Sequence, residues 1–80
     1  MALTEEQFKL RDEVASEFRL KEKNLETFQQ LVSLNHDFSP GADETFDSIR
    51  LKLTVDNPAS LAFSNYQHRW MEHLKEQGQI

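Results

Sequence analysis

Cysteine is absent from this chain of 80 residues. Disulfide bonds, thiolate metal sites and cysteine nucleophiles are therefore excluded as sources of stability or of chemistry. A chain this short also builds only a small hydrophobic core, because the surface grows relative to the volume as a protein becomes smaller. We therefore expect one domain over residues 1–80, with association between two copies of the chain as the remaining source of stability.

Glycine is also scarce, and the two glycines stand alone at positions 41 and 78. Loops that hold phosphate groups need several closely spaced glycines, whose bare backbone can approach the ligand. Two isolated glycines do not meet this requirement. We therefore predict no nucleotide cofactor, and no other residue pattern in the chain indicates a different one.

Positive charge is also in short supply, with nine lysine and arginine residues against fourteen aspartate and glutamate residues. The formal net charge is −5, and no run of basic residues occurs. Binding to a nucleic-acid backbone depends on clustered cations, so we predict no direct contact with DNA or RNA. An acidic surplus is instead typical of solubility, of attraction to a basic protein or of nucleic-acid mimicry.

Long apolar runs are missing as well. Residues 1–7 have neither the basic region nor the apolar stretch of a signal peptide, and no segment is apolar for long enough to cross a bilayer. We therefore expect a cytoplasmic protein that does not associate with membranes.

The clearest pattern that is present lies in the last third of the chain. Asn57 and Pro58 are typical of a helix start, and Gly78 is typical of the position just past a helix end. These residues predict a helix over residues 58–77. Its apolar residues recur every three or four positions and form one aromatic face. The main residues of that face are Phe63, Tyr66, Trp70 and Leu74.

The first third begins with a capping box, in which Thr4 and Gln7 each bond the backbone of the other, and it contains neither proline nor glycine up to Asn35. A helix over residues 4–35 would be about 48 Å long at about 1.5 Å per residue. A compact chain of this size is only about 30 Å across, so the two lengths conflict. The apolar stripe of this segment includes Phe18, Leu25, Phe28 and Val32.

Two arrangements resolve this conflict. Either the chain bends within residues 19–24 and forms a helical hairpin, or the helix stays straight and a second subunit covers half of its face. Residues 19–24 are mostly strong helix formers, and only Asn24 among them is typical of a turn. We therefore favour an uninterrupted or gently bent helix.

After a loop over residues 36–41, marked by Pro40 and Gly41, residues 42–55 fit two interpretations. Residues 49–55 alternate apolar and polar side chains, which is the period of a half-buried strand. We favour a helix, because no second alternating segment offers a partner strand. The helical stripe consists of Ala42, Phe46, Ile49 and Leu53. Leu51 and Val55 lie off it, so we expect them to cover neighbouring helix ends or an interface.

The predicted architecture is an all-α domain of three helices. They are a long N-terminal helix or helical hairpin over residues 4–35, a middle helix over residues 42–55 and the amphipathic aromatic C-terminal helix. In a dimeric helical bundle, the stripe of the first segment would pack against its copy and against the aromatic face. We expect that face to serve chiefly as core or dimer contact, because a short chain without disulfides needs it.

Two groups of residues have some chemical potential. His68 and Glu72 lie one helical turn apart and could bind a divalent metal, but the same spacing is typical of an exposed ion pair, so we predict no metal site. His36 and Asp37, with Ser33 one turn earlier, have the side-chain types of a nucleophilic triad. No glycine-rich oxyanion turn accompanies them, so we predict that His36 lies at a helix end and that no residue is catalytic.

These absences favour a non-enzymatic function. We expect a small acidic helical module that binds a larger protein, as a regulator, an inhibitor or an assembly adaptor. The first alternative is a nucleic-acid mimic that inhibits a DNA- or RNA-binding protein; the second is a metal- or small-molecule-binding protein built around His68, Glu72 and His36. We expect function on the charged faces and at the turn of residues 39–41 rather than on the aromatic face.

Overall fold

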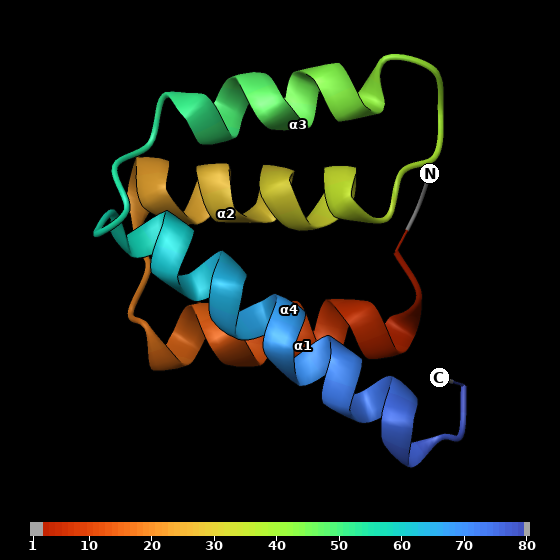
Figure 1. The fold of residues 1–80 in the computed structure, drawn as a ribbon. Coiled ribbons are helices and arrows are strands. Elements are labelled where there is room, and N and C mark those ends of the chain that lie inside the picture. The colour runs from red at the N-terminus through yellow and green to blue at the C-terminus, as the bar shows by residue number, and fades with distance from the viewer. Residues whose placement is uncertain (1–2, 80) are drawn as a thin grey trace.

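Four helices account for most of residues 3–79, the range that the computed structural model describes (Figure 1). They are α1 (Glu5–Glu17), α2 (Glu22–Asn35), α3 (Ala42–Leu51) and α4 (Pro58–Glu76). No strand occurs in this range, so the predicted all-α class is confirmed and the strand interpretation of residues 49–55 is wrong. The predicted number of three helices is also wrong, because the first predicted segment forms two.

The start of α1 follows the capping box that the sequence predicts. The Thr4 hydroxyl accepts the backbone N–H of Gln7 at 3.2 Å, and the Gln7 side-chain oxygen accepts the backbone N–H of Thr4 at 2.9 Å. Two N–H groups that a helix start would otherwise leave without a partner are thereby bonded.

The chain breaks after Phe18, at the segment over residues 19–24 where the sequence favours an unbroken helix over a bend. Arg19 has a φ of 53°, in the left-handed region. Its N–H bonds to the carbonyl of Ser16 at 3.1 Å, and the Leu20 N–H bonds to that of Ala15 at 3.0 Å. These two bonds define a Schellman turn, which usually has glycine at the left-handed position. The prediction failed because the turn here uses an arginine.

The break lets α1 and α2 fold back on each other as a helical hairpin, the alternative that we favoured less. The described chain measures 35 × 32 × 20 Å along its principal axes, which is shorter than an unbroken helix over residues 4–35 would be. The conflict in length is thus resolved within one chain. Length therefore no longer argues for a dimer.

The core lies where α4 runs obliquely across α1 and α2 (Figure 1). Phe28 and Val32 on α2 and Phe63 and Tyr66 on α4 are buried completely or almost so. Phe28 and Tyr66 meet edge to face, with ring centroids 6.5 Å apart. Phe18, Leu25 and Trp70 pack against this core while partly exposed, and Leu74 is half-buried. The full buried cluster consists of Leu3, Val14, Leu20, Phe28, Leu31, Val32, Ala59, Ala62, Phe63 and Tyr66.

The ends of α4 agree with the sequence. The Asn57 side chain accepts the N–H of Ala59 at 2.8 Å, and Pro58 is the first helical residue. At the other end, Gly78 has a φ of 72°. The Gly78 and Gln79 N–H groups bond to carbonyls of the last turn at 3.0 and 2.9 Å, which gives a second Schellman turn.

α3 lies on the opposite side of α2 from α1, at the edge of the molecule (Figure 1). Ala42, Phe46 and Ile49 form the side of α3 that is wholly or partly buried, and Phe46 meets Phe63 of α4 edge to face at 5.4 Å. The helix ends at Leu51, four residues earlier than predicted, and a turn follows. α3 is therefore attached along one side only.

Candidate functional site

The most exposed hydrophobic side chains lie in and around α3. Leu51 is 86% exposed, Val55 is 91% exposed, and Phe38, in the connection before α3, is 84% exposed. Elsewhere in residues 3–79, the large hydrophobic side chains are at most 48% exposed. Neither Leu51 nor Val55 covers the end of a neighbouring helix, so that part of our expectation is wrong. Exposed hydrophobic side chains of this kind are characteristic of interaction surfaces when they occur together.

The exposed side of α3 is also acidic. At 100° per residue, Glu44, Asp47 and Leu51 project from the side opposite the packed residues, and all three are exposed. The segment over residues 37–56, which we call the α3 segment, carries five acidic and two basic side chains. Its formal charge is −3, out of −5 for the whole chain, so most of the acidic surplus lies in the same segment as the exposed apolar residues.

A second cluster forms around His36, at the end of α2. Its Nε2 atom lies 2.7 Å from the Tyr66 hydroxyl of α4, and its Nδ1 atom lies 3.3 Å from the Gln7 side-chain nitrogen of α1. Burial lowers the pKa of His36 below its ordinary value. Burial also raises the pKa of the Tyr66 hydroxyl, against the opposing charge of Arg11. The neutral forms of both side chains therefore join three helices.

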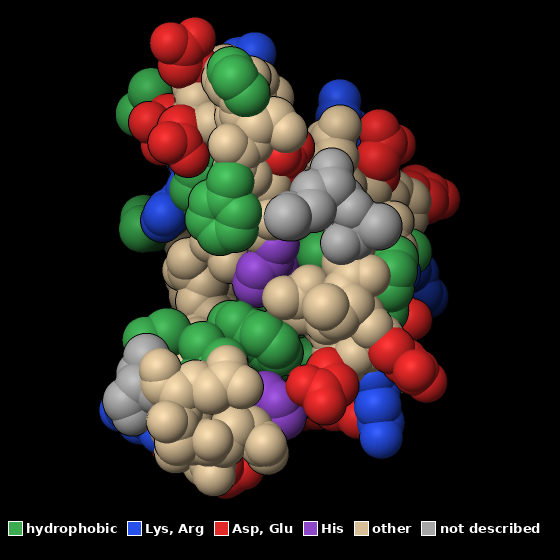
Figure 2. Space-filling model, turned by 90° about the vertical axis from the view of Figure 1, so that its right-hand side faces the viewer, with side chains coloured by type: hydrophobic (Ala, Val, Ile, Leu, Met, Phe, Trp, Pro, Cys, Tyr) green, Lys and Arg blue, Asp and Glu red, His purple; other side chains and the backbone are tan. Residues whose placement is uncertain are grey.

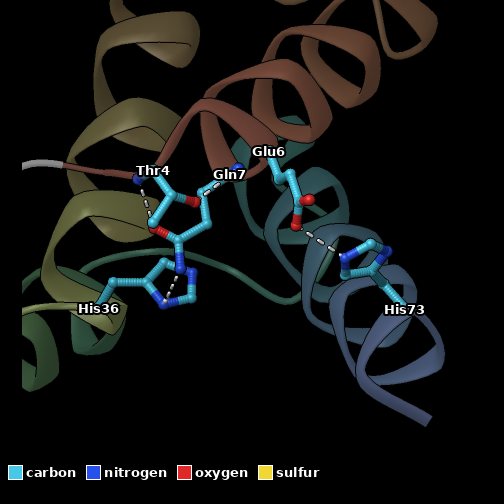
Figure 3. Close-up of polar contacts among 5 residues, drawn as sticks. All are labelled: Thr4, Glu6, Gln7, His36 and His73. Atoms are coloured by element: carbon cyan, nitrogen blue, oxygen red, sulfur yellow. Dashed lines mark hydrogen bonds and ion pairs between the residues drawn. The ribbon is translucent and has the colours of Figure 1, made fainter. Parts of the chain in front are cut away.

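Trp70 connects this cluster to the surface. Its ring meets His36 edge to face at 5.5 Å and stacks on His73 at 5.2 Å. His73 Nε2 lies 2.9 Å from a carboxylate oxygen of Glu6. Figure 3 shows Gln7 directed toward His36 and Glu6 directed toward His73, from neighbouring positions at the start of α1. The two histidines thus contact the same helix and the same indole.

Two open hollows lie along the contact between α1 and α4, with volumes of about 480 and 340 Å³. Both are lined by Glu6, Trp70 and His73, and Figure 2 shows histidine and hydrophobic side chains close together at this end of the molecule. In the larger hollow the only hydroxyl is that of Thr4, which accepts a bond as the helix cap. The groups shared by the two hollows are thus a carboxylate, an indole and an imidazole.

The structure does not assemble the triad types noted in the sequence. The ring nitrogens of His36 face Gln7 and Tyr66, whereas the Asp37 carboxylate accepts the backbone N–H of Ser39 at 2.9 Å. Hydrogen bonding from Ser39 lowers the pKa of Asp37. His36 does cap the end of α2, but its ring bonds to other helices rather than to the carbonyls of its own.

The possible metal ligands are similarly separate. Glu72 lies 3.9 Å from Lys75, an exposed ion pair on α4, and His68 is exposed on the same helix. Among residues 3–79, no three histidine, cysteine, aspartate or glutamate side chains come together in a way that could hold a metal ion.

Sequence reasoning missed the contacts of His36. Its partners lie 29 and 30 residues away, and neither distance corresponds to a helical or strand period. The sequence pattern places Gln7 only in the helix cap and Tyr66 only on the aromatic face. The one signal in the sequence is the residue types: His36 precedes a loop, and Tyr66 is an aromatic residue with a polar tip. The two meet only once the helices pack.

Comparison with known proteins adds no further assignment. No protein-family model matches the chain, and neither a curated protein nor a solved structure shows significant similarity to it. Within the described range, no helix combines the length and the apolar character needed to span a membrane.

Proposed function

We propose that this chain is a non-catalytic protein-interaction module that binds a larger partner through the α3 segment. The observation that carries the proposal is the exposure of Leu51 and Val55, at 86% and 91%, in a chain with few apolar residues to spare. Leaving aliphatic side chains in water is unfavourable by roughly 25 cal/mol per Å² of apolar surface. A partner that covers them recovers this free energy.

The charge of the α3 segment indicates the chemistry of the partner. Glu44 and Asp47 lie on the same side of α3 as Leu51, and the whole segment has a formal charge of −3. A complementary surface has an apolar patch with lysine or arginine side chains beside it, which steer the encounter and set the orientation. The partner is therefore a protein with a basic, partly apolar face.

Site-specific photocrosslinking tests whether the α3 segment binds the partner. The photoreactive variant is expressed in the cells that naturally make this chain. A photoreactive residue at position 55 is expected to give one discrete product heavier than the chain by the mass of the partner. The matched control places the same residue at Met71, which is 47% exposed on α4, and should not give that product. A product only from position 71 would contradict the assignment. A product of twice 9.4 kDa would identify a second copy of the chain instead.

The double variant Leu51→Ser/Val55→Ser separates binding from folding. Because both side chains are almost fully exposed, we expect the free energy of unfolding to change by less than about 0.5 kcal/mol. We expect the affinity for the crosslinked partner to fall by at least about tenfold, as when apolar anchors are removed from an interface. Urea unfolding and isothermal titration calorimetry measure the two quantities. If the affinity of the double variant for the partner is unchanged, Leu51 and Val55 do not belong to the interface.

Nucleic-acid mimicry has less support as an alternative. On α1, Asp12 pairs with Arg11 at 2.9 Å, and Glu17 pairs with Arg69 of α4 at 2.6 Å. Hydrogen bonding from Arg69 lowers the pKa of Glu17. Carboxylates that are paired with cations on the same molecule imitate a row of phosphate groups poorly.

A further inference from the structure

The orientation of the Gln7 amide determines the protonation state of His36. The Gln7 oxygen accepts the backbone N–H of Thr4 at 2.9 Å, so it is the amide nitrogen that faces His36 Nδ1 at 3.3 Å. An amide nitrogen only donates hydrogen bonds, so Nδ1 must accept and carries no proton. The proton of the neutral ring is therefore on Nε2, which donates to the Tyr66 hydroxyl at 2.7 Å.

Protonation of the ring conflicts with this arrangement. The imidazolium has an N–H on both nitrogens, and its Nδ1–H would point at the Gln7 NH₂ group, donor against donor. Rotation of the Gln7 amide would bring its oxygen to His36, but its NH₂ group would then face the Thr4 N–H and the capping box would be lost. When His36 is protonated, the Gln7 side chain must therefore lose either its contact with His36 or its bond to the Thr4 N–H, whichever way its amide is turned.

We propose that His36, Gln7 and Tyr66 form a pH-sensitive switch, which we call the His36 switch. When His36 is neutral and carries its proton on Nε2, the switch holds the end of α2 to α1 and α4. In the protonated form of His36, the Gln7 side chain cannot keep both its contact with His36 and its bond to the Thr4 backbone N–H.

Among residues 3–79, the groups that face the switch supply no compensating carboxylate. From α4, His36 faces the Tyr66 hydroxyl and the edge of Trp70, and the Arg11 guanidinium of α1 acts on Tyr66 with positive charge. On the far side of the indole, Glu6 is bonded to His73 and not to His36. None of these groups offers an acceptor to a new Nδ1–H.

The acidic neighbour on the chain itself, Asp37, is also engaged elsewhere. Its carboxylate bonds to the backbone N–H of Ser39, and its lowered pKa places its own titration well below that of an imidazole.

The direction in which the pKa of His36 is shifted determines how the stability of the protein changes with pH. Burial lowers the pKa of His36 in the folded chain below the value of about 6.5 that applies when the chain is unfolded. The unfolded chain therefore binds the proton first as the pH falls. The contribution of the switch to stability is complete above about pH 6.5 and is lost as the pH falls below it.

The switch acts on the connection that positions α3, because His36 immediately precedes residues 37–41. Loss of its contacts frees this end of α2, and with it the loop that carries Phe38. Acidification then weakens partner binding by the α3 segment, a consequence that rests on the proposed function. The switch itself is testable in the free protein, so its failure and that of the proposed function are distinguishable.

Nitrogen NMR of the imidazole rings tests the switch in the intact chain. The ring of His36 is expected to carry its proton on Nε2 at neutral pH and to be half-protonated below about pH 6.5. A proton on Nδ1, or half-protonation above that pH, would overturn the proposal.

The variant Gln7→Glu tests the proposed conflict directly. Glutamate serves equally well in a capping box, and its carboxylate accepts hydrogen bonds from both Thr4 and a protonated His36. The pH of half-protonation of His36 should rise by about one unit or more, and the loss of stability between about pH 8 and pH 5 should shrink or reverse. Gln30→Glu, an exposed change of equal charge on α2, should leave both quantities as in the native chain. Equal shifts in the two variants would show a general charge effect and refute the switch.

Discussion

The ends of α1 and α4 are built as the same turn from different residues. In both, the residue after the cap has a positive φ, 53° at Arg19 and 72° at Gly78, and the next two N–H groups make the same pair of backward hydrogen bonds. The residue that follows differs in its surroundings. Leu20 is buried in the core, whereas Gln79 is exposed.

The two turns reach the same backbone conformation for different reasons, one local and one dependent on the core. At the end of α4, glycine adopts the left-handed conformation at no steric cost, so the local sequence is sufficient. At the end of α1, an arginine adopts it at a cost of about 1–2 kcal/mol. Burial of a leucine side chain contributes about 1.5–3 kcal/mol, so the core contact of Leu20 is large enough to offset the strain at Arg19.

Truncation of the buried anchor should have the largest effect. We expect Leu20→Ala to lower the free energy of unfolding by about 2 kcal/mol or more, through lost burial and the cavity that remains. Urea unfolding followed by circular dichroism measures this change. Leu51→Ala is the matched control, because the same truncation at an exposed position should cost less than about 0.5 kcal/mol. Equal effects of the two variants would show that the core does not hold the turn.

The same contrast explains how much of the fold was predictable. The starts of α1 and α4 and the end of α4 were predicted because Thr4, Asn57 and Gly78 act within one helical turn. The break after Phe18 was not predicted because the burial of Leu20, which stabilises the turn, exists only once the helices pack into the core. A stretch rich in helix formers and without glycine or a strong turn signal predicts a continuous helix, and tertiary packing overrides that preference.

The candidate site divides in the same way. Leu51 and Val55 were identified as off the helical stripe, because periodicity along one helix is visible in a sequence. The bonds of His36 to Gln7 and Tyr66 were not, because they join residues 29 and 30 positions apart. Local periodicity thus pointed to the surface proposed for binding, whereas the polar cluster required the packed helices.

Relief of the strain at the α1 turn should have a smaller effect of opposite sign. We expect Arg19→Gly to raise the free energy of unfolding by about 0.5–1 kcal/mol, because glycine removes the steric cost of the positive φ and adds some entropy to the unfolded chain. The midpoint of urea unfolding measures this change. Arg19→Ala is the control, since alanine keeps the Cβ atom and the strain. A destabilised glycine variant would mean that Arg19 is not strained.

The converse change at the α4 turn should have the smallest effect on the whole protein. A Cβ atom at Gly78 would meet no other atom within 4 Å, so Gly78→Ala introduces only the backbone cost of the positive φ. Residues 75–79 are exposed and can unwind without opening the core, so the free energy of unfolding should fall by less than about 0.5 kcal/mol. Amide hydrogen exchange should instead show the loss locally, as faster exchange at Gln79. A global destabilisation as large as that of Leu20→Ala would mean that the two turns depend on the core to the same extent.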